Sequence, residues 1–131
     1  MTFQECYEQV ILPTFERLKA DYEKRYPSAR GEILIQGSSH ALGIEYPANE
    51  KGLLGWYWNI AFVPDEGDEG TATIFYLAGA DASHFREYTP SKPIKFRMIT
   101  AAMIVALANQ LKQEIDSVIT AHKRQWPDTY K

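Results

Sequence analysis

The sequence has little cysteine: Cys6 is the only one among 131 residues. A single thiol excludes an intrachain disulfide and a cysteine-rich zinc site. Because the chain cannot rely on disulfides, we expect it in a reducing compartment, the cytoplasm. No lysine or histidine lies near Cys6 in the sequence, so we interpret it as a buried, inert thiol rather than a nucleophile.

Long apolar runs are also absent. The longest run, Ala101 to Ala108, is far shorter than the roughly 20 residues that a membrane-spanning helix requires. The segment from Met1 to Glu8 lacks the basic start and apolar stretch of a secretory signal. We therefore expect no membrane partner and no export.

The sequence contains none of the common catalytic motifs. The sequence has no Gly-x-Ser-x-Gly, His-Glu-x-x-His, Walker or Gly-x-Gly-x-x-Gly pattern, so we assign no catalytic residue. The histidines are interpreted as structural or surface residues; they are His40, His84 and His122. We expect no cofactor and no metal site.

Positive charge is scarce in one part of the chain. The formal net charge is -3 overall, but residues 31–70 hold one lysine against seven acidic residues, a net charge of -6. Four of these acids form the turn 65–69, whose spacing differs from an EF-hand loop and which we interpret as a solvated hairpin tip that can attract a basic partner. The one basic cluster, around Lys92 to Arg97, is too far from Lys123 to form a single patch, so nucleic acid is disfavoured as a partner.

What is present suits one globular domain over residues 1–131, with 45% hydrophobic and 24% charged residues. Thr2 and Glu5 form a capping-box pattern, and apolar residues then recur at helical spacing, which predicts a helix over residues 3–25. Pro13 predicts a kink or break in it near Val10 to Leu12. A second helical pattern covers residues 96–124, and we interpret residues 80–95 as a linker with a short helical turn.

Between the helices the pattern becomes extended. Strands are predicted at residues 32–36, 40–46, 54–63 and 71–78, joined by turns rich in Gly, Ser, Asn, Asp and Pro. Short connections favour an antiparallel meander. The predicted fold is therefore α+β with two layers: a helix, a four-stranded antiparallel meander and a helix, with both long helices on one face of the sheet. This order of elements resembles that of bacterial secretion-chaperone-like and related small adaptor domains.

The most aromatic stretch is Gly55 to Val63. Alternation places Trp56, Trp58, Ile60 and Phe62 on one face of the strand and Tyr57, Asn59, Ala61 and Val63 on the other. If the acidic turn sets Val63 opposite Thr71, Asn59 lies opposite Phe75 and Tyr57 lies opposite Leu77. Both faces are then partly apolar, although two helices can cover only one.

Three explanations for the second apolar face stay open. The sheet curls or the 80–97 segment folds over it; a second copy or a partner protein covers it; or it forms a small-molecule pocket floored by Trp56 and Trp58. We expect a non-enzymatic cytoplasmic interaction module, adaptor-like, chaperone-like or toxin-neutralising, acting as a homodimer. The alternative is a small-molecule-binding protein or enzyme with an aromatic cavity around Trp56 and Trp58. The candidate partner- or ligand-binding residues are Trp56, Tyr57, Trp58, Phe75, Leu77, Tyr76 and His40.

Overall fold

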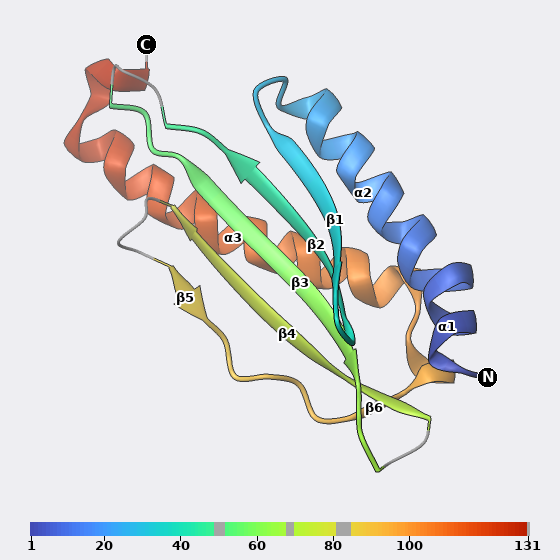
Figure 1. Ribbon diagram of the computed structural model, residues 1–131. Coiled ribbons are helices and arrows are strands. Elements are labelled where there is room, and N and C mark those ends of the chain that lie inside the picture. The colour runs from blue at the N-terminus through green and yellow to red at the C-terminus, as the bar shows by residue number, and fades with distance from the viewer. Residues whose placement is uncertain (49–51, 68–69, 81–84, 131) are drawn as a thin grey trace.

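The chain folds as an α+β structure in which two long helices pack on an antiparallel sheet (Figure 1). The structure is a computed structural model that describes residues 1–48, 52–67, 70–80 and 85–130. Its order is α1 (Phe3–Cys6), a π-helical turn (Tyr7–Ile11), α2 (Leu12–Arg25), β1 (Arg30–Gln36), β2 (Ser39–Tyr46), β3 (Trp56–Pro64), β4 (Thr71–Ala80), β5 (Arg86–Glu87), β6 (Ile94–Lys95), a 3₁₀ turn (Phe96–Met98), α3 (Ala101–Gln125) and a 3₁₀ turn (Pro127–Tyr130). The predicted α+β class is confirmed.

The N-terminal helix begins and bends as its sequence predicts. The Thr2 hydroxyl accepts a hydrogen bond from the Glu5 amide at 3.1 Å, and the Glu5 carboxylate accepts one from the Thr2 amide at 3.2 Å. A π-helical turn then precedes Pro13, with the Leu12 amide donating to the Tyr7 carbonyl five residues back. The wider turn relieves the crowding that the proline ring would cause in a regular α-helix.

The sheet has six strands rather than the predicted four. Strands β1 to β4 follow one another in antiparallel order, as the short connections predict. The two extra strands, β5 and β6, pair with β4 within the segment that we had interpreted as a linker. That segment also donates from the Tyr88 and Ser91 amides to the carbonyls of Tyr76 and Ile74. Its signal was missed because strands of two residues carry no readable alternation.

Two further details differ from the prediction. The β3–β4 register places Val63 opposite Thr73 rather than Thr71, a shift of two residues that leaves every side chain on its predicted face. Helix α3 begins at Ala101 instead of residue 96, because the Thr100 hydroxyl caps it by accepting from the Met103 amide at 3.2 Å.

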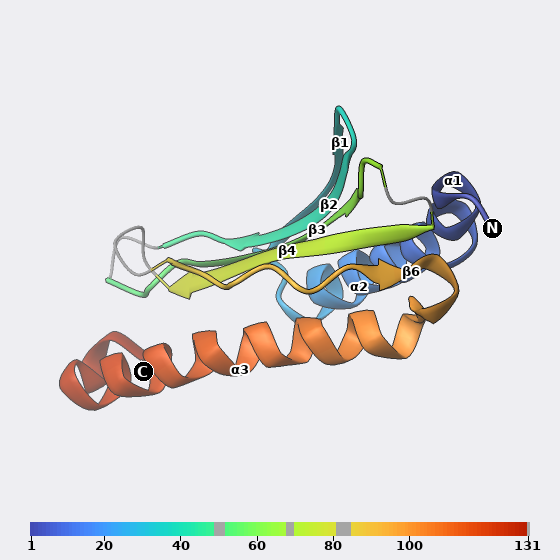
Figure 2. The same cartoon turned by 90° about the horizontal axis from the view of Figure 1, so that it is seen from below.

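Both long helices lie on the same side of the sheet (Figure 2). Helix α2 contacts β1 and β2, and α3 contacts β4 and β3. The buried residues form one cluster between these layers, whose largest fully buried members are Trp58, Phe15, Phe62, Ile11, Leu42, Ile44, Ile60, Ile104, Leu111 and Ile115.

An aromatic group closes one end of this core. Trp58 is fully buried and meets the ring of Tyr22 edge-on at 5.3 Å. The indole N–H of Trp58 lies near the Tyr22 side chain without reaching hydrogen-bond geometry. Burial is the main reason that the pKa of Tyr22 rises to about 12.

The raised pKa of Tyr22 predicts a loss of stability in alkali. Below pH 10 both the folded and the unfolded chain keep the phenol proton, so Tyr22 adds no pH dependence. Between pH 10 and about 12 the unfolded chain releases that proton while the folded chain retains it. The free energy of unfolding should therefore fall by up to about 3 kcal/mol across this window.

Urea denaturation at several pH values above 9 measures this fall. The matched variant is Tyr22→Phe, which keeps the ring and removes the titrating group. It should lose most of the slope, with the remainder from Tyr7, Tyr88 and Cys6, whose pKa values burial also raises. A variant whose stability falls as steeply as that of the wild type would contradict the assignment to Tyr22.

Candidate functional site

The candidate site is the face of the sheet that no helix covers. Cross-strand register places its side chains in rows that run from β1 to β4. The first row is Arg30, Glu45, Tyr57 and Gly79; the second is Glu32, Gly43, Asn59 and Leu77; the third is Leu34, Ala41, Ala61 and Phe75. We call this surface the open face.

Apolar side chains stand exposed at both sides of the open face. Leu34 on β1 is 41% exposed, and Phe75 on β4 is 45% exposed. Ala41 and Ala61 lie between them in the same row, so the middle of the row is low. Leu34 and Phe75 are three strand spacings apart, which is about 14 Å. This row therefore has two small residues between two exposed apolar side chains, and we call the row the trough.

A glycine deepens the neighbouring row. A Cβ atom at Gly43 would stand 2.8 Å from the Tyr57 hydroxyl and 3.3 Å from the Asn59 amide nitrogen. Only glycine therefore lets Tyr57 lie across β2, where its hydroxyl accepts a hydrogen bond from Asn59 at 3.0 Å. The result is a groove of about 390 Å³, lined by Arg30, Gly31, Glu32, Leu34, Gly43, Glu45, Tyr57 and Asn59.

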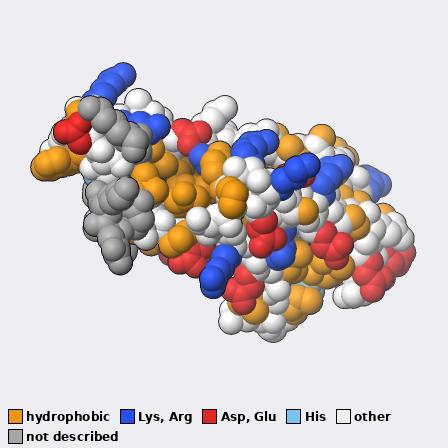
Figure 3. Space-filling view, turned by 90° about the horizontal axis from the view of Figure 1, so that it is seen from above, with side chains coloured by type: hydrophobic (Ala, Val, Ile, Leu, Met, Phe, Trp, Pro, Cys, Tyr) orange, Lys and Arg blue, Asp and Glu red, His pale blue; other side chains and the backbone are white. Residues whose placement is uncertain are grey.

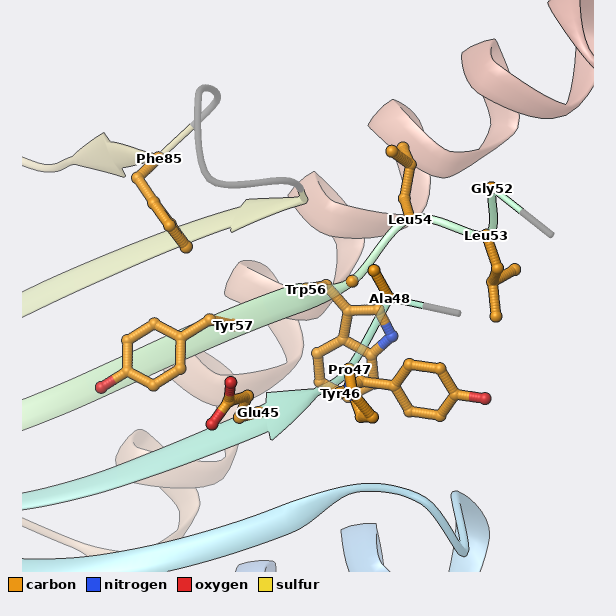
Figure 4. A pocket seen from close by; sticks show the side chains of 11 residues that line it. Glu45, Tyr46, Pro47, Ala48, Gly52, Leu53, Leu54, Trp56, Tyr57 and Phe85 are labelled. Atoms are coloured by element: carbon orange, nitrogen blue, oxygen red, sulfur yellow. The ribbon is translucent and has the colours of Figure 1, made fainter. Parts of the chain in front are cut away.

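A second, larger hollow continues this groove at the end of the sheet. It measures about 580 Å³ and is mostly apolar, lined by Glu45, Tyr46, Pro47, Ala48, Gly52, Leu53, Leu54, Gly55, Trp56, Tyr57 and Phe85 (Figure 4). Phe85 meets the Tyr57 ring edge-on at 5.9 Å. Hydrophobic side chains gather toward this end of the molecule in the space-filling view (Figure 3). We call this hollow the terminal pocket.

Glu45 and Tyr57 join the two hollows, since both residues line both of them. Glu45 and Glu32 are carboxylates on exposed positions of the groove, against the single guanidinium of Arg30. The groove therefore offers apolar contacts beside an excess of negative charge.

The sequence-derived candidates divide between the two faces. Tyr57, Leu77 and Phe75 lie on the open face. Trp56, Trp58 and Tyr76 lie on the helix side, where Tyr76 stacks on Tyr88 at 5.1 Å.

The two tryptophans differ in what they can contact. Trp58 is fully buried in the core, so its ring cannot floor an open cavity. Trp56 is 5% exposed, with Tyr46 stacked on it at 5.4 Å and the Lys112 ammonium 5.0 Å above its ring, and it borders the terminal pocket.

His40 lies in a packed aromatic cluster. Its ring meets the edges of Phe3 at 4.9 Å and Tyr7 at 4.5 Å, and its Nδ1 lies 3.1 Å from the Ser38 carbonyl oxygen. His40 is 9% exposed and lines none of the hollows formed by the described residues near the open face. These contacts give it a packing role at the N-terminal end of the core.

Sequence reasoning missed several residues of the site. Leu34 could have been found, since alternation separates it from Ile33 and Ile35 and puts it on the face of Phe75. Glu32 and Gly43 follow from the same alternation once β1 and β2 are paired. Phe85 could not be found, because it lies outside the predicted strands. Its contact with Tyr57 depends on the tertiary fold, which the local sequence pattern does not predict.

Other sequence features have structural roles. The Asp65 carboxylate accepts hydrogen bonds from the hydroxyls of Thr71 at 2.8 Å and Thr73 at 2.6 Å, which close the β3–β4 hairpin. Asp68, Glu69 and His84 lie outside the described residues. Cys6 is fully buried, as expected, and burial raises the pKa of its thiol. The basic cluster is split by Phe96, which is buried.

Within the described parts of the chain, no group of three or more His, Cys, Asp and Glu residues is arranged to hold a metal ion. The described helices include none with the length and apolarity to cross a bilayer. No protein-family model matches the chain, and no curated protein or solved structure shows significant similarity to it.

Replacing His40 with alanine tests its packing role. The variant removes two edge-on ring contacts from a nearly closed cluster, so the free energy of unfolding should fall by about 2 kcal/mol in urea denaturation. His40→Phe keeps a ring in the same place and should recover most of this loss. Equal losses in the two variants would show that the imidazole nitrogens carry the contribution instead.

Proposed function

We propose that the chain is a non-enzymatic, cytoplasmic protein-interaction module, of the adaptor or chaperone-like kind, that works as a homodimer and binds a partner on the open face. The supporting observation is the row Leu34, Ala41, Ala61 and Phe75, in which exposed apolar walls flank a low floor. Within the segment 80–97, which the sequence offered as a cover, residues 86–95 run along the edge of β4 (Figure 1), and Phe85 contacts Tyr57 at one end of the open face.

The trough fits an amphipathic helix as the partner element. The backbones of β1 and β4 are about 14 Å apart along the sheet, which is close to the 10 to 12 Å diameter of an α-helix with side chains. A sheet with helices on one face gains a third layer when another helix packs on the other face. Glu32 and Glu45 beside the trough favour lysine or arginine next to the apolar stripe of that helix.

A displayed library of random 16-residue peptides tests this proposal. Peptides selected on the wild-type protein should carry apolar residues at helical spacing flanked by Lys or Arg. Phe75→Asp places a charge on the trough wall and should weaken their binding by about 100-fold, measured by fluorescence anisotropy. Phe75 is exposed, so circular dichroism should show the variant folded.

Met98→Asp is the matched control, since Met98 is also an exposed hydrophobic residue but lies on the 3₁₀ turn before α3. It should bind the selected peptides as the wild type does. Peptides that bind Phe75→Asp unchanged, or that are enriched in acidic residues, would overturn the proposal.

The terminal pocket supports a second candidate function, binding of a small apolar molecule. Its volume lies in the range of small-molecule sites, and the Trp56 side chain on its wall provides an aromatic contact. Native mass spectrometry of protein purified from its own host would separate the two functions. A retained mass of a few hundred daltons on each chain would favour the ligand, whereas retained polypeptide would favour the interaction module.

A further inference from the structure

Strand β1 forms a free edge of the sheet. It pairs with β2 through seven consecutive residue pairs, and no strand of the described chain pairs with its other side. The opposite edge of the sheet is covered, because β5, β6 and the amides of Tyr88 and Ser91 pair with β4. Among the described strands, β1 is therefore the long one whose outer side has no strand partner.

The centre of the β1 edge has few of the features that usually prevent pairing between molecules. Strand β1 has no proline, no lysine and no bulge in its register with β2, and its two charged residues, Arg30 and Glu32, precede this centre. Its centre is Ile33, Leu34 and Ile35, of which Leu34 is 41% and Ile35 is 56% exposed. The end of the β1–β2 hairpin also curls away from the helices, so they leave it accessible (Figure 2).

Hydrogen bonding identifies the backbone groups that remain available. The Gly31 amide donates to the Glu23 carboxylate at 3.5 Å, so it points away from β2 and already has an acceptor. Backbone groups alternate in direction along a strand, so those of Ile33 and Ile35 point the same way as those of Gly31. Within the part of the chain that the structure describes, no strand pairs with Ile33 and Ile35 on this side, so their backbone groups are the donors and acceptors of the edge.

We propose that a second copy of this chain binds the β1 edge, in antiparallel register about a two-fold axis at Leu34. Ile33 of each copy then lies opposite Ile35 of the other, and the two pairs exchange four backbone hydrogen bonds. Leu34 lies opposite Leu34 of the second copy on the open face. The two sheets become one continuous sheet, and the open faces of the two copies join.

A second copy fits this edge for reasons of symmetry. The pairing is isologous, so each copy uses its one free edge and assembly stops at two chains. The covered edge at β4 prevents growth into a fibre. Four hydrogen bonds and three apolar side chains per copy make a small contact, so we expect dissociation in the micromolar range.

This inference deepens the homodimer part of the proposed function, but it uses the β1 edge and not Phe75. Introducing a charge at Leu34 tests the proposed dimer, because the two-fold axis places this residue opposite the same residue of the second copy. Leu34→Lys and Leu34→Glu each place like charges face to face, and each should raise the dissociation constant by about 100-fold. An equimolar mixture of the two variants pairs opposite charges and should recover the dimer.

Sedimentation velocity at about 100 µM protein measures these states against the 15.0 kDa mass of one chain. Ile35→Pro is the second variant: it removes the outward amide alone, leaves the β1–β2 pairing intact and should also yield single chains. Ile35→Val keeps that amide and should remain a dimer, as should Phe75→Asp.

A wild-type protein that sediments as a single chain at this concentration would overturn the dimer, while the helix proposed for the open face would still be judged by peptide selection alone. Dimers that persist in both Leu34 variants would equally overturn it, as would a mixture that shows no recovery. Failure of peptide selection with intact dimers would instead count only against the partner proposed for the open face.

Discussion

The structure depends on the burial of one face of β3. Trp56, Trp58, Ile60 and Phe62 all point to the same side, where Phe15 and Tyr22 of α2 contact them. The removal of this apolar surface from water drives both helices onto the same side of the sheet. The two helices form a layer across one face of the four long strands, and no helix of the described chain covers the other face.

The open face follows from that constraint. Since side chains alternate along a strand, every strand that contributes to the core also presents residues to the opposite side. On the two central strands of that side, Ala41, Gly43 and Ala61 are small and lie beside the polar residues Glu45, Tyr57 and Asn59. Leu34 and Phe75 stand at the two sides. Small residues between two exposed apolar side chains are suited to a docked element.

Sequence reasoning predicted those parts of the fold that depend on periodicity. The N-terminal helix with its distortion before Pro13, the consecutive antiparallel strands and the facing of each residue of β3 were all predicted correctly. The β3–β4 register was wrong by two residues, because alternation is unchanged by such a shift and only the hairpin geometry at Asp65 decides it. The short strands β5 and β6 were missed because they depend on the β4 edge rather than on their own residues.

The candidate site was predicted less well than the fold, for a related reason. Aromatic content drew attention to Trp58, but a large apolar ring is most often the centre of a core, and here it is fully buried. The exposed apolar residues are instead ones such as Leu34, which the sequence does not distinguish from its apolar neighbours. Their exposure depends on which elements of the tertiary structure pack against them.

The two proposed surfaces are connected through Leu34. On one side it forms the wall of the trough opposite Phe75, and on the other it stands at the free edge of β1. Pairing of two edges would shield part of Leu34 from water and restrict its rotamers, which lowers the cost of ordering this side chain when a partner helix binds. Dimerisation and partner binding would then favour one another, because pairing at the β1 edge orders Leu34 and the partner helix contacts the same side chain.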